Sequence, residues 1–88
     1  MVLDGRGRTP VSDGGPEIVV YRQPHCASCD GVERFLAERG LEFEVRDVSQ
    51  DTQALEEIAS RGYMSTPVTR IGQHWVAGFP RKKLEDLL

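Results

Sequence analysis

Residues 18–29 read Ile18-Val19-Val20-Tyr21-Arg22-Gln23-Pro24-His25-Cys26-Ala27-Ser28-Cys29. The apolar, β-branched run at the start of this segment predicts a buried strand over residues 17–21. Gln23-Pro24-His25 ends the strand, since proline lacks the N–H group that a sheet needs. Cys26 and Cys29 are the only cysteines in the chain, and a helical pattern follows them. The segment therefore predicts a strand, a short loop and a Cys-x-x-Cys pair at the start of a helix.

The apolar residues after this segment predict three helices and three more strands. Val32, Phe35 and Leu36 share one helical face, and Gly40 can end that helix. Strict alternation over residues 41–45 predicts a second strand with one buried face. Ser49 or Asp51 can cap a second helix, which Gly62 ends and whose apolar face carries Leu55, Ile58 and Ala59.

A third strand is predicted over residues 66–71 and a fourth over 74–76, joined by a turn at Gly72-Gln73. The last helix is predicted to start at Pro80 and to turn Leu84, Leu87 and Leu88 toward the sheet.

The predicted order βαβαββα defines an α/β fold. A right-handed crossover makes the first two strands parallel, and the later hairpin adds an antiparallel pair. We therefore expect a four-stranded mixed sheet flanked by three helices, in one domain over residues 16–88. Residues 1–15 are rich in Gly, Asp, Arg and Pro, which predicts a flexible N-terminal extension.

Composition narrows the possible classes of function. The chain has 88 residues and a formal net charge of −3, which argues against a nucleic-acid-binding protein. It contains neither an apolar run of ~20 residues nor the apolar core of a signal peptide, so we expect a cytoplasmic monomer without a membrane span. Two cysteines do not form a structural disulfide framework. In a reducing compartment they are more plausibly catalytic or metal-binding.

The spacing of the two cysteines suits dithiol redox chemistry. The start of a helix offers unpaired N–H groups and the positive end of the helix dipole, which stabilise a thiolate. We therefore expect Cys26 to be the nucleophile, because the thiolate is the form that attacks disulfides. Cys29 lies one helical turn further on and can resolve the mixed disulfide that results.

The segments 21–29 and Ser65-Thr66-Pro67-Val68, together with the order of elements, resemble the glutaredoxin branch of the thioredoxin superfamily. The segment Trp75-Val76-Ala77-Gly78-Phe79-Pro80 is similar to one in the glutaredoxin-like NrdH redoxins. The resemblance implies a thioredoxin-like fold, no bound cofactor, protein disulfides as substrates and ribonucleotide reductase as one of them. It also implies a cis proline that faces the cysteines, and substrate contacts from Thr66, Pro67, Val68, Trp75, Gly78 and Phe79.

Several of these residues have a physical reason to act at such a site. A cis bond before Pro67 is cheap, at about 0.5–1 kcal/mol, and would turn the backbone of Thr66 toward the cysteines. His25, as a cation, and Arg22 are candidates for tuning the pKa of Cys26. Trp75 and Phe79 could form an apolar contact surface beside the cysteines.

The resemblance leaves the electron donor open. Glutaredoxins that use glutathione usually carry lysine where Gln23 stands, and a Gly-Gly…Asp segment near residues 77–80, of which only Gly78 is present. These departures favour a thioredoxin-reductase-like flavoprotein over glutathione as the donor.

Two other interpretations use the same cysteines. One is a glutathione-dependent glutaredoxin. The other is a metal or iron–sulfur carrier, since two chains could supply four cysteines to a cluster. A zinc site within one chain would need Cys26, Cys29, His25 and His74, but the adjacency of His25 and Cys26 makes tetrahedral closure awkward. We therefore predict no metal site within one chain, and the cluster shared by two chains stays an alternative.

Overall fold

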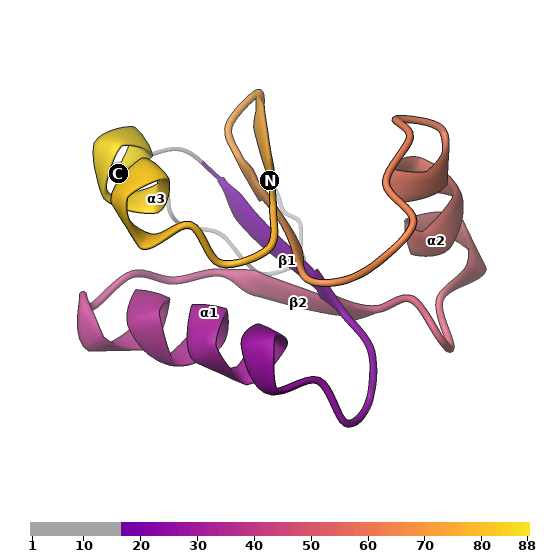
Figure 1. Cartoon of the computed structure of the whole chain (residues 1–88), viewed down its shortest axis with the longest axis horizontal. Helices are drawn as coiled ribbons and strands as arrows, with labels where there is room; N and C mark the ends of the chain where they lie inside the picture. The colour runs from indigo at the N-terminus through magenta and orange to yellow at the C-terminus, as the bar shows by residue number, and fades with distance from the viewer. Residues whose placement is uncertain (1–16) are drawn as a thin grey trace, which may run out of the picture.

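Seven helices and strands follow one another in the predicted order, in a computed structural model that describes residues 17–88 (Figure 1). The extension predicted for residues 1–15 lies outside the described residues. The elements are β1 (Ile18–Arg22), α1 (Ala27–Glu38), β2 (Glu44–Asp47), α2 (Thr52–Ala59), β3 (Val68–Ile71), β4 (His74–Ala77) and α3 (Arg81–Leu87).

The four strands form one mixed sheet in the order β2-β1-β3-β4. β1 is parallel to β2 and antiparallel to β3, and β3 and β4 form an antiparallel hairpin. Both the parallel start and the hairpin at Gly72-Gln73 are confirmed, and with them the predicted α/β fold.

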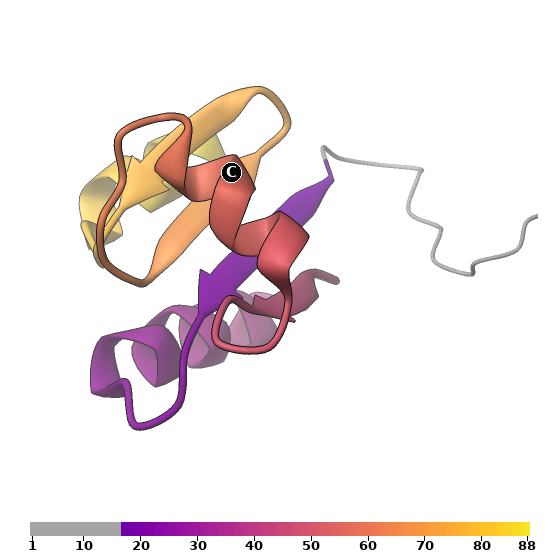
Figure 2. The same cartoon turned by 90° about the vertical axis from the view of Figure 1, so that its right-hand side faces the viewer.

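The helices lie on both faces of the sheet. In Figure 2, α2 lies in front of the sheet, and α1 and α3 lie behind it. Because side chains alternate along a strand, β1 contributes to two cores. Ile18 and Val20 pack with the apolar faces of α1 and α3. Val19 and Tyr21 pack with α2. The loop from β1 into α1 emerges at one end of this three-layer arrangement.

The boundaries of α1 match the predicted signals. Cys26 is the N-cap residue, with extended backbone angles, and its side chain accepts a hydrogen bond from the backbone of Cys29. At the other end Arg39 is the C-cap, and Gly40 follows with φ of 74°. Glycine suits this left-handed conformation because it has no Cβ to clash.

The predicted bounds of the second strand need correction. The second strand covers residues 44–47 instead of 41–45; Leu41 and Phe43 pack at the margin of a core before the strand begins, and Val45 is 44% exposed. β2 lies at the edge of the sheet, where alternation is a weak guide to burial.

Parts of the predictions for α2 and α3 also need correction. Asp51 caps α2, as one of the two predicted alternatives, but the helix buries Ala54 and Ile58 while Leu55 is 46% exposed. Pro80 is the N-cap of α3 and not its first helical residue. In α3, Leu84 is fully buried whereas Leu88 is 37% exposed.

One buried hydroxyl gives a stability prediction. Thr69 of β3 is fully buried between Val20 and Val76, and its Oγ1 has no hydrogen-bond partner among residues 17–88. A buried polar group without a partner costs about 1–3 kcal/mol. We expect Thr69→Val to raise the free energy of unfolding by about 1 kcal/mol, measured by urea denaturation. Thr69→Ser keeps the hydroxyl and loses a methyl group, so it should lower stability; a Val variant less stable than the wild type would contradict this explanation.

Candidate active site

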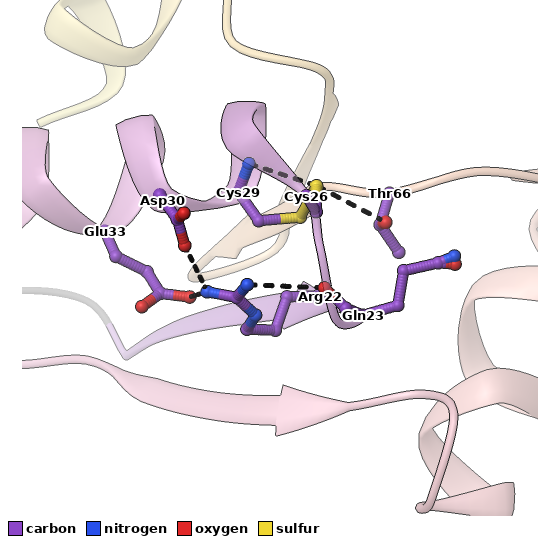
Figure 3. The surroundings of a disulfide bond; sticks show 7 residues. All are labelled: Arg22, Gln23, Cys26, Cys29, Asp30, Glu33 and Thr66. Atoms are coloured by element: carbon purple, nitrogen blue, oxygen red, sulfur yellow. Dashed lines mark hydrogen bonds and ion pairs between the residues drawn. A yellow bond between two sulfur atoms is a disulfide. The ribbon is translucent and has the colours of Figure 1, made fainter.

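The two cysteines form a disulfide at the start of α1 (Figure 3). The backbone N–H of Cys29 donates a hydrogen bond to Cys26 Sγ over 3.2 Å. Cys26 Sγ therefore occupies the N-cap acceptor position, where the first N–H groups of the helix converge. In the reduced protein the same donor and the helix dipole favour a negative charge on this sulfur.

The two sulfurs differ in exposure. The Cys29 side chain is fully buried, whereas Cys26 is only half-buried. An incoming disulfide can therefore reach Cys26 from solvent but not Cys29. The arrangement can carry out an attack by Cys26 followed by resolution from Cys29 behind it.

Thr66 and Pro67 form the facing wall of the site. The Thr66 hydroxyl donates to Cys26 Sγ over 3.8 Å, and the two side chains point toward one another in Figure 3. The Thr66–Pro67 peptide bond is cis, as the resemblance implied. The structure thus brings together residues that lie forty positions apart in the chain.

Arg22 takes part in an ion-pair cluster under the first turns of α1. Its Nη1 lies 2.8 Å from both Asp30 Oδ1 and Glu33 Oε2, and Nη2 donates to the carbonyl oxygen of Gln23 (Figure 3). The hydrogen bonds to Asp30 and Glu33 raise the pKa of Arg22. In the sequence alone the two carboxylates look like part of a solvated helix face; their three-residue spacing is the signal that places them together on one side of α1.

This cluster gives a prediction about the reactive thiol. Arg22→Gln would leave Asp30 and Glu33 without their cation, close to the start of α1, and the added negative potential would disfavour a thiolate there. We expect the pKa of Cys26 to rise, measured as the pH dependence of its alkylation rate with iodoacetamide. Arg34→Gln removes the same charge from an exposed position of the same helix and should shift this pKa less. If both variants shifted the pKa of Cys26 equally, that pKa would depend on the net charge of the chain and not on the ion pairs of Arg22.

His25 directly precedes the nucleophile and is exposed. Its φ of 59° lies in the left-handed region, which turns the chain from β1 into α1. Histidine is among the non-glycine residues found there more often than most. A role for His25 in tuning Cys26 stays a prediction.

Gly78 and Phe79 connect the two walls of the site. The Gly78 N–H donates to the Pro67 carbonyl oxygen over 2.8 Å. The Phe79 ring packs edge-on against Phe35 and covers Gly31 of α1, where a Cβ atom would lie 3.0 Å from the ring. The segment therefore fixes the distance between the Pro67 loop and the start of α1.

The close approach of Phe79 to Gly31 predicts a coupling between the two positions. Alanine in a helix is favoured over glycine by about 1 kcal/mol, but in the wild type a Cβ at residue 31 would displace the ring. In a Phe79→Ala background the same Gly31→Ala change should become stabilising. A double-mutant cycle by urea denaturation should give a coupling energy of about 1 kcal/mol or more. Additive effects would mean that the ring moves aside at no cost.

Val68 and Trp75, also predicted to contact substrate, have packed side chains. Val68 is fully buried in the core beneath α2, so its contact with a substrate, which stays a prediction, would have to use the backbone. Trp75 lies on the α2 face of the sheet, stacked on Tyr21 and Tyr63, whereas Phe79 packs on the opposite face. The single apolar surface expected from Trp75 and Phe79 does not form.

Residues 17–88 contain no group of three or more His, Cys, Asp or Glu side chains that could hold a metal ion. None of the helices in this part of the chain has the length and apolar character needed to cross a membrane.

Comparisons with known proteins match this geometry. A family model described as Glutaredoxin matches residues 18–76, a range that contains both cysteines and Thr66–Pro67. The chain is 29% identical over 62 residues to the glutaredoxin-like protein NrdH of Escherichia coli strain K12, covering 70% of this chain and 76% of that protein.

Solved structures agree with the sequence matches. The crystal structure of a thioredoxin-like protein has a TM-score of 0.78 at 37% identity, over 82% of this chain and all of the other (100%). The glutaredoxin-like NrdH-redoxin from Escherichia coli, whose structure is described as the basis of a thioredoxin-like activity profile, has a TM-score of 0.77 at 26% identity. It covers 82% of this chain and 95% of its own.

Proposed function

Because the chain belongs to the glutaredoxin family and is a thiol–disulfide oxidoreductase with a Cys26–Cys29 pair, we propose that it is a dithiol electron carrier that reduces protein disulfides and is recharged by a thioredoxin-reductase-like flavoprotein. The observation that carries the proposal is the asymmetry of the pair: a half-buried Cys26 at the N-cap of α1, backed by a fully buried Cys29.

The reaction proceeds in two exchanges. The Cys26 thiolate attacks one sulfur of the substrate disulfide, forms a mixed disulfide and releases the other substrate sulfur as a thiolate. Cys29, after losing its proton, then attacks Cys26 Sγ and releases the second substrate thiol. Two electrons have moved to the substrate, and the carrier is left with the disulfide between Cys26 and Cys29.

Thr66, Pro67 and the Gly78–Phe79 segment are proposed to position the substrate at Cys26. The hydroxyl of Thr66 already lies 3.8 Å from Cys26 Sγ. A substrate chain that lies along the Thr66 backbone would bring its disulfide to the attacking sulfur. Pro67 has no N–H group, so pairing beyond Thr66 is disfavoured.

Two observations support a reductase as the electron donor. Gln23 is neutral where glutathione-using relatives are expected to carry a cation, and Arg22 beside it is already engaged by Asp30 and Glu33. The NrdH-redoxin of Escherichia coli is itself described by a thioredoxin-like activity profile. Ribonucleotide reductase, which the NrdH resemblance implied, is the first physiological substrate we would test.

An NADPH-coupled assay of insulin disulfide reduction tests the proposal. The carrier would be supplied either with thioredoxin reductase or with glutathione and glutathione reductase, and NADPH consumption would be followed. Turnover with thioredoxin reductase alone is the expected result. Turnover only with glutathione would establish the glutathione-dependent alternative, and no turnover with either donor would overturn the carrier proposal and direct attention to cluster or metal binding.

A further inference from the structure

The face of the sheet covered by α2 carries an open pocket of about 640 Å³ that does not include the cysteines. Its lining comes from the end of α2 and the segment after it on one side, and from β3, β4 and the turn between them on the other. The residues that line it include Trp75 of β4, Arg70 of β3, Gln73 of the turn, and Ser60 and Arg61 beyond α2.

Two arginines share the indole of Trp75. The guanidinium carbon of Arg61 lies 4.3 Å from the centroid of the indole ring, and that of Arg70 lies 5.9 Å away. Such contacts use the flat face of a guanidinium. The N–H edge of Arg70 is already occupied, because its Nη1 donates to the Gly72 carbonyl oxygen over 3.0 Å and its Nη2 lies 3.5 Å from Glu17 Oε1. Because such an edge matches the two oxygens of a carboxylate, the anion donor that the pocket offers beside its aromatic surface is Arg61.

The charge of the pocket is positive once its own ion pairs are counted. Glu57 also lines it, but its carboxylate accepts hydrogen bonds from the Tyr21 hydroxyl over 2.7 Å and from Arg46 over 3.0 Å. These bonds lower the pKa of Glu57, so it stays ionised and paired. Arg70 faces the exposed Glu17 at 3.5 Å.

Arg61 is the arginine of the pocket that supplies the excess positive charge. Within residues 17–88 it has no carboxylate at ion-pair distance. The pocket thus holds an excess positive charge in a chain whose formal net charge is −3. Charge complementarity therefore points to an acidic ligand, and the open shape suits an extended chain better than an enclosed small molecule.

We propose that this pocket binds an acidic peptide segment of the protein whose disulfide Cys26 attacks, with a carboxylate on Arg61 and its apolar atoms against Trp75. The proposal rests on the proposed function for the identity of the partner. The chain from Arg61 to Thr66 spans at most about 18 Å. One substrate segment can therefore occupy the pocket while a nearby disulfide meets Cys26.

A fluorescence titration tests binding without any redox turnover. Trp75 is the only tryptophan in the chain, so its emission reports on this pocket alone. The probe is a short acetylated and amidated peptide in which glutamate alternates with glycine, and its control has glutamine in place of each glutamate. We expect the acidic peptide to cause a saturable change at low ionic strength that weakens as salt is raised, and the glutamine peptide to cause none.

Matched arginine variants localise the binding. Arg61→Gln should raise the Kd of the acidic peptide about threefold or more, which is the effect expected from losing an exposed ion pair. Arg39→Gln removes the same charge from the other face of the sheet, where Arg39 lies over Phe35, and should bind as the wild type does. Equal losses of affinity in both variants, or equal affinity for the two peptides, would contradict the proposal that acidic peptides bind at this pocket.

A second arm tests the link to the substrate. Each peptide is extended with a cystine-bridged loop, and its rate of reduction by the carrier is measured. We expect the acidic peptide disulfide to have a KM about threefold lower than the glutamine form, with this difference lost in Arg61→Gln. Equal KM values would overturn the assignment to the substrate. Because the titration needs no electron transfer, a failure of the proposed function would not change its result.

Discussion

Replacing Cys26 with serine is expected to abolish disulfide reduction, lowering the insulin turnover rate by at least about 10³-fold, as removal of a nucleophile does in other enzymes. The reason is structural as well as chemical. The remaining thiol, Cys29, is fully buried and cannot meet a protein disulfide. The assay is NADPH consumption in the coupled reaction at saturating reductase.

The control for Cys26→Ser is the folded state of the variant. Serine can still act as the N-cap of α1, so the helix should form and the unfolding transition of the reduced protein should change little. A folded variant that retained a substantial part of the wild-type rate would contradict the role of Cys26.

Replacing Cys29 with serine should have a different effect. The attack by Cys26 remains possible, but the mixed disulfide can no longer be resolved from within the chain, so the protein should accumulate bound to its substrate. Steady-state reduction of insulin through thioredoxin reductase should be lost in this variant, while a single stoichiometric attack is retained.

Intact-protein mass spectrometry under non-reducing conditions measures this directly. The mass of Cys29→Ser mixed with a model disulfide should increase by one substrate half, and reduction should reverse the increase. The Cys26→Ser variant is the matched control and should gain no mass. Mass gain in Cys26→Ser but not in Cys29→Ser would mean that the two roles are exchanged.

The sequence was sufficient for the features that depend on local patterns. The apolar strand, the proline break and the helical spacing after Gly31 are all short-range signals, and they correctly placed Cys26 at the start of α1. Gly40 likewise follows from a conformation that only glycine adopts easily.

The remaining errors come from contacts between elements. The alternation of side chains along a strand predicts that Trp75 and Val76 face opposite sides of β4. Only the packed sheet shows that Trp75 belongs to the core on the α2 side. In α2 the small Ala54 is buried in the core with Val19 and Tyr21 of β1, whereas the larger Leu55 is 46% exposed.

The ion pairs of the site could not be predicted from the sequence for the same reason. Asp30 and Glu33 have the periodicity of a solvated helix face, and their function becomes visible only when β1 brings Arg22 within 2.8 Å of both. The contact of Gly31 with Phe79 likewise joins two segments that no local pattern relates.

Competitive alkylation of the reduced wild-type protein is the measurement that most directly tests whether Cys26 is the attacking thiol. The protein would be treated with a limiting amount of iodoacetamide below the ordinary thiol pKa of ~8.5, and the modified cysteine located by peptide mapping. Modification of Cys26 with Cys29 left free is the predicted result, since the N-cap position favours its thiolate and its side chain is accessible. Equal modification of both cysteines, or preferential modification of Cys29, would contradict it.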